Sequence, residues 1–180
     1  MMVGFSPTTT LAQNVYGVLP EFSLKDHENS PFEKKNLHGK IWLMHTFFTS
    51  CASVCPTLIT DIKKIILALP EVDRPAVMSI TVDPLKDTPE HLAEYHHKHG
   101  LCDFDWKLIT GEPNSITTFI EKGLLLASPG GDTPDAHSPR IVLIDKESKI
   151  RGFYHISDPL DIQRLQKDLK ALISDKTLTK

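Results

Sequence analysis

Long apolar runs without alternation mark two segments of the chain, "GKIWLMHTFF" (39–48) and "AVMSITVD" (76–83). Continuous runs of this length, bounded by turn-forming residues, are typical of strands buried on both faces of a sheet. Shorter apolar runs predict further strands at "DWKLIT" (105–110), "RIVLID" (140–145) and "IRGFYHI" (150–156). The polar turn "KESK" joins the last two, so they are expected to form a hairpin.

Between these strands, apolar residues recur at helical spacing. One helix is predicted after residues 51–55, with Pro56 in its first turn and Pro70 at its end. Its apolar face comprises Leu58, Ile62, Ile65, Ile66 and Leu69. Further helices are predicted at residues 88–100, 113–127 and 158–173. Thr88 or Asp87 is expected to cap the helix at 88–100, and Gly100 suits the position just past its end.

The order of these elements predicts an α/β fold, with a mixed central sheet and helices on both faces. The strands at 39–48 and 76–83 are joined through a helix and should run parallel, so their carboxyl ends share one edge. We expect one domain over residues 18–175, a flexible N-terminal segment at 1–17 and a frayed tail at 176–180.

The amino-acid composition argues against some classes of function. The 180 residues are 40% hydrophobic with a net charge of −3, which gives no electrostatic footprint for nucleic acid or an acidic membrane surface. The N-terminus contains neither a signal peptide nor a transmembrane helix. The protein is therefore either cytosolic or has had its targeting segment removed.

Candidate chemistry gathers at the shared sheet edge. Cys51 and Cys55 leave the end of the first long strand, and Asp83 leaves the end of the second. If the strand that begins near Arg140 runs antiparallel to these two, its start lies on the same edge, and His137 immediately precedes it. Two thiols, a carboxylate and an imidazole would then converge.

A cysteine at a helix N-terminus is expected to favour the thiolate, the form that binds metals and attacks disulfides. Two thiolates and one imidazole suit Cu(I), whereas zinc would usually require a fourth ligand and Mg²⁺ and Ca²⁺ require oxygen. The same two cysteines could instead close a disulfide. Metal binding and thiol–disulfide exchange both remain open, and plain core packing is the inert alternative.

The motifs "TSCASVCPTL" (49–58), "TVDPLKDTPE" (81–90) and "AHSPRIVLIDKESKIRGFY" (136–154) together resemble the Sco/SenC family of thioredoxin-like copper proteins. The resemblance implies a thioredoxin-like fold and copper binding through Cys51, Cys55 and His137, with Cu(I) preferred, Cu(II) possible and Asp83 in a supporting position. It also implies a monomeric metallochaperone that delivers copper to the binuclear centre of cytochrome c oxidase subunit II, or to another copper-accepting protein.

Members of that family usually lie in the bacterial periplasm or the mitochondrial intermembrane space, tethered by an N-terminal membrane helix. We therefore expect a periplasmic protein, anchored to the inner membrane in its full-length form, with the anchor absent from this chain. Ala52-Ser53 departs from the Pro-Asp often found between the family's cysteines. Pro139 stands where ordinary thioredoxins have a cis-proline.

Three other functions are weighed against copper delivery. A thiol–disulfide oxidoreductase would use Cys51 and Cys55 as its redox pair and act on cysteines of the oxidase or of other envelope proteins. A peroxiredoxin-type peroxidase would require proline at position 44 and threonine at position 48. The chain has Met44 and Phe48 there, which argues against this function. A pure interaction module would be favoured only if the thiols were buried and inert.

Several other residues have simpler interpretations. Cys102 is expected to be a small buried hydrophobe, since free cysteine is among the most buried residue types. Asp87 and Glu90 are interpreted as helix caps. The histidines of the helix at 88–100 are interpreted as solvated surface residues: His91, His96, His97 and His99.

Overall fold

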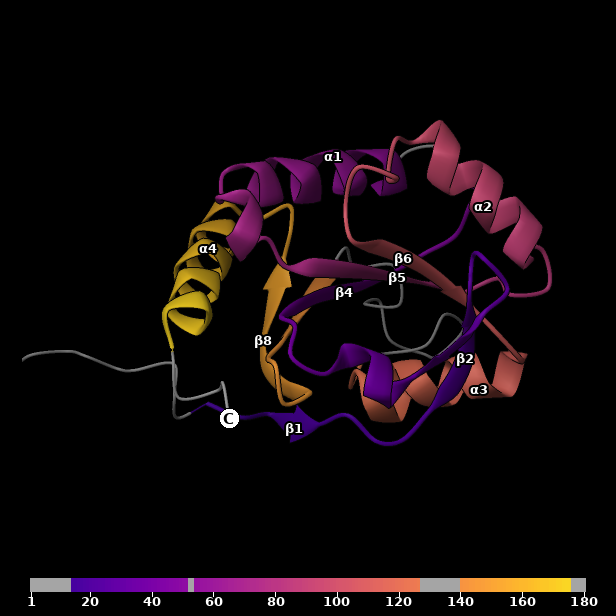
Figure 1. Cartoon of the computed structure of the whole chain (residues 1–180), viewed down its shortest axis with the longest axis horizontal. Helices are drawn as coiled ribbons and strands as arrows, with labels where there is room; N and C mark the ends of the chain where they lie inside the picture. The colour runs from indigo at the N-terminus through magenta and orange to yellow at the C-terminus, as the bar shows by residue number, and fades with distance from the viewer. Residues whose placement is uncertain (1–13, 52–53, 127–139, 176–180) are drawn as a thin grey trace, which may run out of the picture.

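The computed structural model describes residues 14–51, 54–126 and 140–175. Within them, one sheet of eight strands has the order β1-β8-β7-β4-β5-β6-β2-β3 (Figure 1). The strands are β1 (Gly17–Val18), β2 (Ser23–Asp26), β3 (Pro31–Glu33), β4 (Trp42–Phe47), β5 (Ala76–Thr81), β6 (Trp106–Thr110), β7 (Arg140–Ile144) and β8 (Lys149–His155). The helices are α1 (Val54–Leu67), α2 (Pro89–Lys98), α3 (Pro113–Thr118) and α4 (Pro159–Ser174).

The central strands have the predicted directions. β4 pairs in parallel with β5, from Trp42↔Ala76 to Phe47↔Thr81, and β5 pairs in parallel with β6. β7 pairs antiparallel to β4 and forms the predicted hairpin with β8. The mixed sheet and the α/β class are therefore confirmed.

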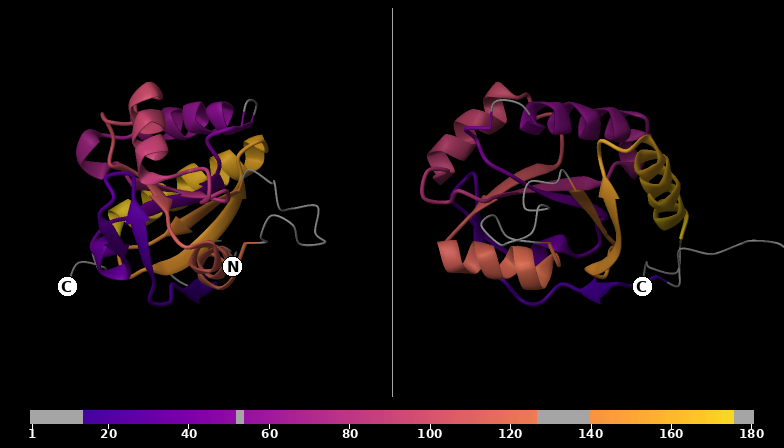
Figure 2. Two further views of the ribbon diagram at one scale, coloured as in Figure 1. Left: turned by 90° about the vertical axis from the view of Figure 1, so that its right-hand side faces the viewer. Right: turned by 180° about the vertical axis from the view of Figure 1, so that it is seen from behind.

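Helices cover both faces of the sheet, as Figures 1 and 2 show. Side chains of β4 alternate between two cores because successive residues of a strand point to opposite faces. Leu43 and Phe47 belong to the core that contains residues of α1, α2 and α4. Trp42 and Met44 belong to the core that contains Ile116 of α3. Because both of its faces are buried, β4 reads as a continuous apolar run in the sequence.

Two predicted helices differ in detail from the sequence interpretation. Thr88, and not Asp87, caps α2, since its side chain accepts a hydrogen bond from the backbone N–H of His91. Gly100 follows α2 with φ +59°, the left-handed conformation that glycine adopts most readily. The helix predicted at 113–127 is α-helical only over Pro113–Thr118 and continues as a π-helix over Phe119–Gly123.

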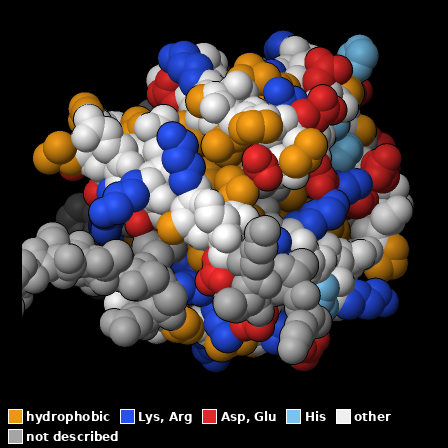
Figure 3. All heavy atoms as spheres, turned by 60° about the vertical axis from the view of Figure 1, so that its left-hand side comes forward, with side chains coloured by type: hydrophobic (Ala, Val, Ile, Leu, Met, Phe, Trp, Pro, Cys, Tyr) orange, Lys and Arg blue, Asp and Glu red, His pale blue; other side chains and the backbone are white. Residues whose placement is uncertain are grey.

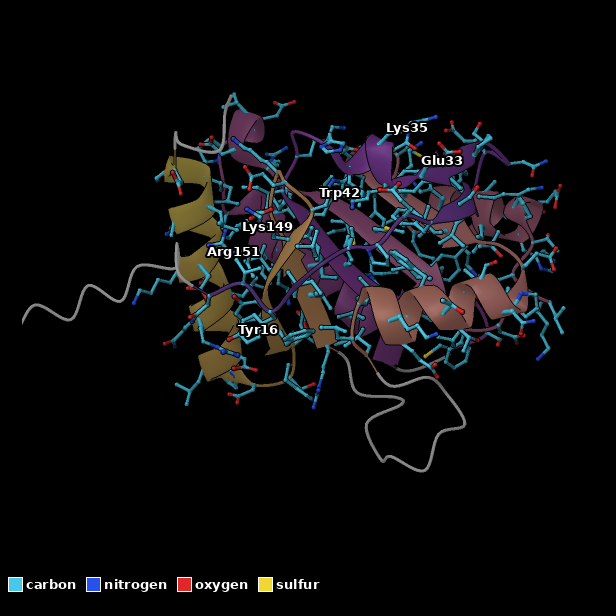
Figure 4. The ribbon with its side chains drawn as sticks, turned by 90° about the horizontal axis from the view of Figure 1, so that it is seen from below. Tyr16, Glu33, Lys35, Trp42, Lys149 and Arg151 are labelled. Carbon is cyan, nitrogen blue, oxygen red and sulfur yellow. The ribbon has the colours of Figure 1, made fainter. Side chains whose placement is uncertain are left out.

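Three short strands near the N-terminus were not predicted. β1 pairs with β8, and β2 pairs with both β3 and β6. The N-terminal chain is bound to β8: the backbone N–H of Tyr16 donates to the Ile150 carbonyl at 2.9 Å, and Arg151 Nε donates to the Asn14 carbonyl at 3.1 Å (Figure 4). Gly17, at the end of the predicted flexible segment, therefore lies in strand β1, and Asn14 and Tyr16 are hydrogen-bonded to residues of β8.

Arg151 is held at this position by a buried ion pair. Its guanidinium lies 2.8 Å from the Asp145 carboxylate, and both side chains are almost fully buried.

On the face shown in Figure 3, lysine and arginine side chains are interspersed with aspartate and glutamate, in keeping with the small net charge. Of the helices in the described ranges, none is long and apolar enough to cross a membrane.

Candidate metal centre

The candidate site lies where β4 and β5 end. Phe47 and Thr81, the last residues of these strands, are register partners, so the chain leaves both strands at the same edge of the sheet. Cys51 follows β4 and Cys55 lies in the first turn of α1. The antiparallel register of β7 with β4 places Arg140 toward this same edge. The predicted convergence of the two strand ends with the start of the β7 strand is thus confirmed for the backbone.

The two thiols are adjacent and reduced. The backbone N–H of Cys55 donates a hydrogen bond to Cys51 Sγ at 3.4 Å, and the Cys51 N–H donates to the Phe48 carbonyl at 3.2 Å. Cys51 is half-buried, whereas Cys55 is only 6% exposed. Cys51 is therefore the sulfur that an incoming ligand reaches first.

The environment of Cys55 does not favour its thiolate in the metal-free protein. Burial, with a smaller contribution from the Cys51 side chain, raises the pKa of this thiol to about 12. A helix N-terminus typically contributes about 0.3–1 kcal/mol, less than one pKa unit, so burial outweighs it here. The expectation that the helix terminus makes Cys55 a thiolate is corrected accordingly, and metal binding there must displace a proton.

Asp87 has a different role from the predicted helix cap. Its carboxylate is 1% exposed and accepts hydrogen bonds from the Thr49 backbone N–H at 3.1 Å, from the Thr49 hydroxyl and from the Thr81 hydroxyl. It thereby joins the segment that carries Cys51 to the end of β5. The negative charge of Asp87 also contributes to the raised pKa of Cys55.

Asp83 lies at the predicted edge but is engaged elsewhere. Its carboxylate pairs with Lys86 Nζ at 3.0 Å, and its backbone N–H donates to the Thr81 hydroxyl at 3.0 Å. Its carbonyl accepts the backbone N–H of Asp87 at 2.9 Å, which fixes the turn into α2. Asp83 thus shapes the loop from which Asp87 reaches the cysteine segment.

Tyr95 of α2 also borders the site, and the sequence analysis did not identify it. The residue is 8% exposed, and its hydroxyl is buried without a hydrogen-bond partner among the described residues. Its ring packs against Phe47 at 5.6 Å between centroids. Burial, and then the nearby Cys55, Cys51 and Asp87, raise the pKa of Tyr95. The helical spacing of apolar residues in this segment is consistent with a buried Tyr95. It does not indicate that Tyr95 lies near the two cysteines.

Cys102 and His96 also differ from their sequence interpretations. Cys102 is exposed, so its predicted burial is wrong. His96 is half-buried and contacts Cys102, so it is not a solvated surface histidine. Cys102 precedes β6, which starts at the edge opposite to the one where Cys51 lies, because β4, β5 and β6 are parallel.

The described part of the site supplies two of the three proposed metal ligands. Over residues 14–51, 54–126 and 140–175, no group of three or more His, Cys, Asp or Glu side chains is placed to hold a metal ion. His137 and Pro139 lie outside these residues, as do Ala52 and Ser53. Two sulfurs form a soft donor pair that fits Cu(I) and does not fit Mg²⁺ or Ca²⁺.

Comparisons with known proteins agree on one family. The model of the SCO1/SenC family matches residues 12–174. The SCO2-like protein of Rickettsia felis is 34% identical over 158 residues, which cover 82% of this chain and 74% of that protein. A protein of Stutzerimonas stutzeri named as a putative copper-binding protein is 27% identical over 167 residues, covering 88% and 78%.

Solved structures give the same result. A SCO1/SenC family lipoprotein from Bacillus anthracis superposes with a TM-score of 0.73 at 27% identity, over 89% of this chain and 98% of that chain. Bradyrhizobium japonicum ScoI with copper bound gives a TM-score of 0.66 at 24% identity, over 86% and 99%, and this likeness concerns the fold alone. The chain therefore belongs to the SCO1/SenC family and has its thioredoxin-like fold.

Proposed function

We propose that this protein binds one copper ion through Cys51, Cys55 and His137 and delivers it during assembly of the binuclear centre of cytochrome c oxidase subunit II. The observation that carries the proposal is the arrangement of the sheet edge. The adjacent thiols follow the end of β4, and β7, which begins three residues after His137, starts toward the same edge. A relative named as a putative copper-binding protein supports the choice of metal.

The donor set determines the chemistry of the cargo. Sulfur and imidazole ligands favour Cu(I), and the site also allows Cu(II) when the thiols are ionised. Because Cys55 is protonated in the metal-free protein, loading releases a proton. Cys51 is more exposed than Cys55, so a copper-accepting protein would exchange ligands with Cys51 first. We further propose a periplasmic location with an N-terminal membrane anchor in the full-length protein.

One observation favours thiol–disulfide exchange as a second candidate. The hydrogen bond from the Cys55 backbone to Cys51 Sγ brings the two thiols together, and Cys51 is accessible to an external disulfide. In this reaction Cys51 would attack a partner disulfide, and Cys55 would then release the reduced partner by closing the internal disulfide. Copper delivery and thiol–disulfide exchange both use the sulfur atoms of Cys51 and Cys55.

Titration of the reduced protein with Cu(I) against a competing chelator tests the proposal. We expect one Cu(I) per chain, retained in Cys102→Ser, which removes a thiol at the opposite sheet edge. We expect loss of stoichiometric binding in Cys51→Ser and in Cys55→Ser. A reduced protein that takes up no stoichiometric copper, or that keeps its affinity in both serine variants, would overturn the copper proposal.

A further inference from the structure

Cys102 is the thiol that the copper proposal leaves unused. It lies in the segment between α2 and β6, at the opposite edge of the sheet from Cys51, and it is exposed. Its Sγ atom lies 3.5 Å from Nδ1 of His96, a half-buried residue in the last turn of α2. The pair is therefore a thiol and an imidazole in contact, open to solvent on the sulfur side.

The second nitrogen of His96 fixes the tautomer of the ring. His96 Nε2 lies 3.0 Å from the backbone carbonyl oxygen of Trp106, which can only accept a hydrogen bond. Nε2 therefore carries the hydrogen, and Nδ1 of the neutral ring is the acceptor that faces Cys102. A base oriented by a third group beside a sulfur is the arrangement that activates cysteine nucleophiles.

The ring plane of His96 is also fixed. His27, in the turn after β2, stacks on it with centroids 4.1 Å apart and an interplanar angle of 20°. The His27 ring is in turn held by the backbone N–H of Leu108, which donates to His27 Nδ1 at 3.4 Å. The Trp106 carbonyl and the His27 ring therefore together hold the His96 ring with Nδ1 facing the Cys102 sulfur.

Charged groups from three elements act on His96. Burial lowers the pKa of His96 most, and the hydrogen bond to the Trp106 carbonyl opposes it. Lys107 of β6 and His97 of α2 lower the pKa further, while Glu28 after β2 raises it. Lys107 is itself paired with Asp26 and Glu28. The lowered pKa keeps the imidazole neutral at neutral pH, so the lone pair of Nδ1 can accept the hydrogen bond of the Cys102 thiol.

We propose that Cys102 and His96 form a second thiol site that reacts with low-molecular-mass disulfides. The thiol proton passes to His96 Nδ1, and the Cys102 thiolate attacks one sulfur of the disulfide. A new S–S bond forms between Cys102 and that sulfur, and the original S–S bond breaks. The departing thiolate takes the proton from His96. One disulfide is consumed and one is formed, so no further oxidant or reductant is required.

The size of the effect has an upper bound. An unperturbed thiol with a pKa near 8.5 is about 3% ionised at pH 7, so complete ionisation would raise its rate by at most about thirtyfold. The imidazole contact is expected to supply a substantial part of this factor, roughly tenfold.

The test uses the full chain with oxidised glutathione and, separately, the neutral alkylating agent iodoacetamide. Modification of Cys102 is followed by peptide mass mapping after acid quenching, which reads this thiol independently of Cys51 and Cys55. His96→Gln is the informative variant, because its side-chain amide nitrogen can still donate to the Trp106 carbonyl while no base remains beside the sulfur. His91→Gln, on the same helix and exposed, is the matched control, since His91 is not among the groups that shift the pKa of His96.

At pH 7 we expect His96→Gln to slow both reactions of Cys102 by about tenfold, and His91→Gln to leave them within twofold of wild type. If His96→Gln does not fold, the wild-type protein alone decides: a rate of Cys102 alkylation by iodoacetamide at pH 7 no higher than that of free glutathione overturns the proposal. Equal rates in His96→Gln and wild type overturn it as well.

Discussion

The backbone N–H of Cys55 donates a hydrogen bond to the Sγ atom of Cys51 across 3.4 Å. Cys51 precedes α1 and Cys55 lies in its first turn, so the first cysteine is not constrained by helical geometry. A pair within one regular helix would hold its sulfurs on successive turns. Here the non-helical position of Cys51 lets its sulfur approach the N-terminal end of the helix.

Oxidation of the metal-free protein with ferricyanide should therefore give one intramolecular disulfide between Cys51 and Cys55, with Cys102 left as a thiol. Cys102 is excluded because it lies at the opposite edge of the sheet. Peptide mass mapping identifies the bridge, and a bridge between Cys102 and either other cysteine would contradict the prediction. The oxidised protein should no longer bind copper, because a disulfide offers no thiolate.

Asp87→Ala should destabilise the protein by at least about 2 kcal/mol, because it leaves the half-buried Thr49 N–H and the buried Thr81 hydroxyl without their acceptor. Asp83→Ala is the matched control: its side chain makes a surface pair with Lys86, and the loss should be under about 1 kcal/mol. Urea unfolding of both variants measures the difference. Equal losses in the two variants would show that the Asp87 contacts are not a major source of stability.

The central fold could be predicted because its signals are local and long. The apolar run of β4 and the helical spacing in α1 each extend over several residues, and their order determines the parallel pairing. β1, β2 and β3 were missed because each has at most four residues. β2 and β3 each contain one buried apolar side chain, Leu24 and Phe32, and β1 contains none. Periodicity cannot be read from so few positions.

The site was predictable to a similar degree. Cys51 and Cys55 could be placed from strand order and the position of Pro56, since these depend on chain topology. The contacts of Asp87 and the exposure of Cys102 depend on side chains brought together from distant segments, and a single sequence contains no signal for them. The raised pKa of Cys55 likewise results from burial by residues that do not neighbour it in the sequence.

Tyr95→Phe should leave the stability of the metal-free protein unchanged or raise it by about 1 kcal/mol, because the buried hydroxyl that it removes lacks a hydrogen-bond partner in the described structure. Tyr154→Phe is the matched comparison, since Tyr154 donates to the Asp168 carboxylate at 2.7 Å. It should lose about 1–2 kcal/mol. Thermal unfolding of both variants tests the pair, and a larger loss at Tyr95 than at Tyr154 would contradict the assignment.

His45 should make stability depend on pH. It is fully buried, its Nδ1 contacts the Thr46 carbonyl at 3.2 Å, and its Nε2 lies 2.7 Å from the Ser79 hydroxyl, which can donate to the neutral ring. Burial lowers the pKa of His45 from 6.5 to about 4. Below pH 6.5 the unfolded chain therefore binds a proton that the folded protein does not, and stability falls as the pH decreases toward 4.

The contribution of His45 amounts to about 2 kcal/mol between pH 7 and pH 5, at 1.36 kcal/mol per unit. His45→Gln should reduce the pH dependence of the unfolding free energy by about this amount, whatever its effect on stability at pH 7. Urea unfolding at both pH values gives the comparison. The same pH dependence in wild type and variant would show that His45 titrates normally.

Replacement of His137 separates the two proposed functions. A three-coordinate Cu(I) site needs the imidazole, whereas disulfide exchange needs only the two sulfurs. His137→Ala should weaken Cu(I) binding at least about tenfold, since even loss of a residue that supports a ligand typically costs 10–100-fold in metal affinity. Formation of the Cys51–Cys55 disulfide should continue.

His97→Ala, which replaces an exposed histidine of α2, is the matched control and should bind copper like wild type. An affinity of the reduced His137→Ala protein within about threefold of wild type would show that the imidazole is not a ligand, and thiol–disulfide exchange would then become the leading function.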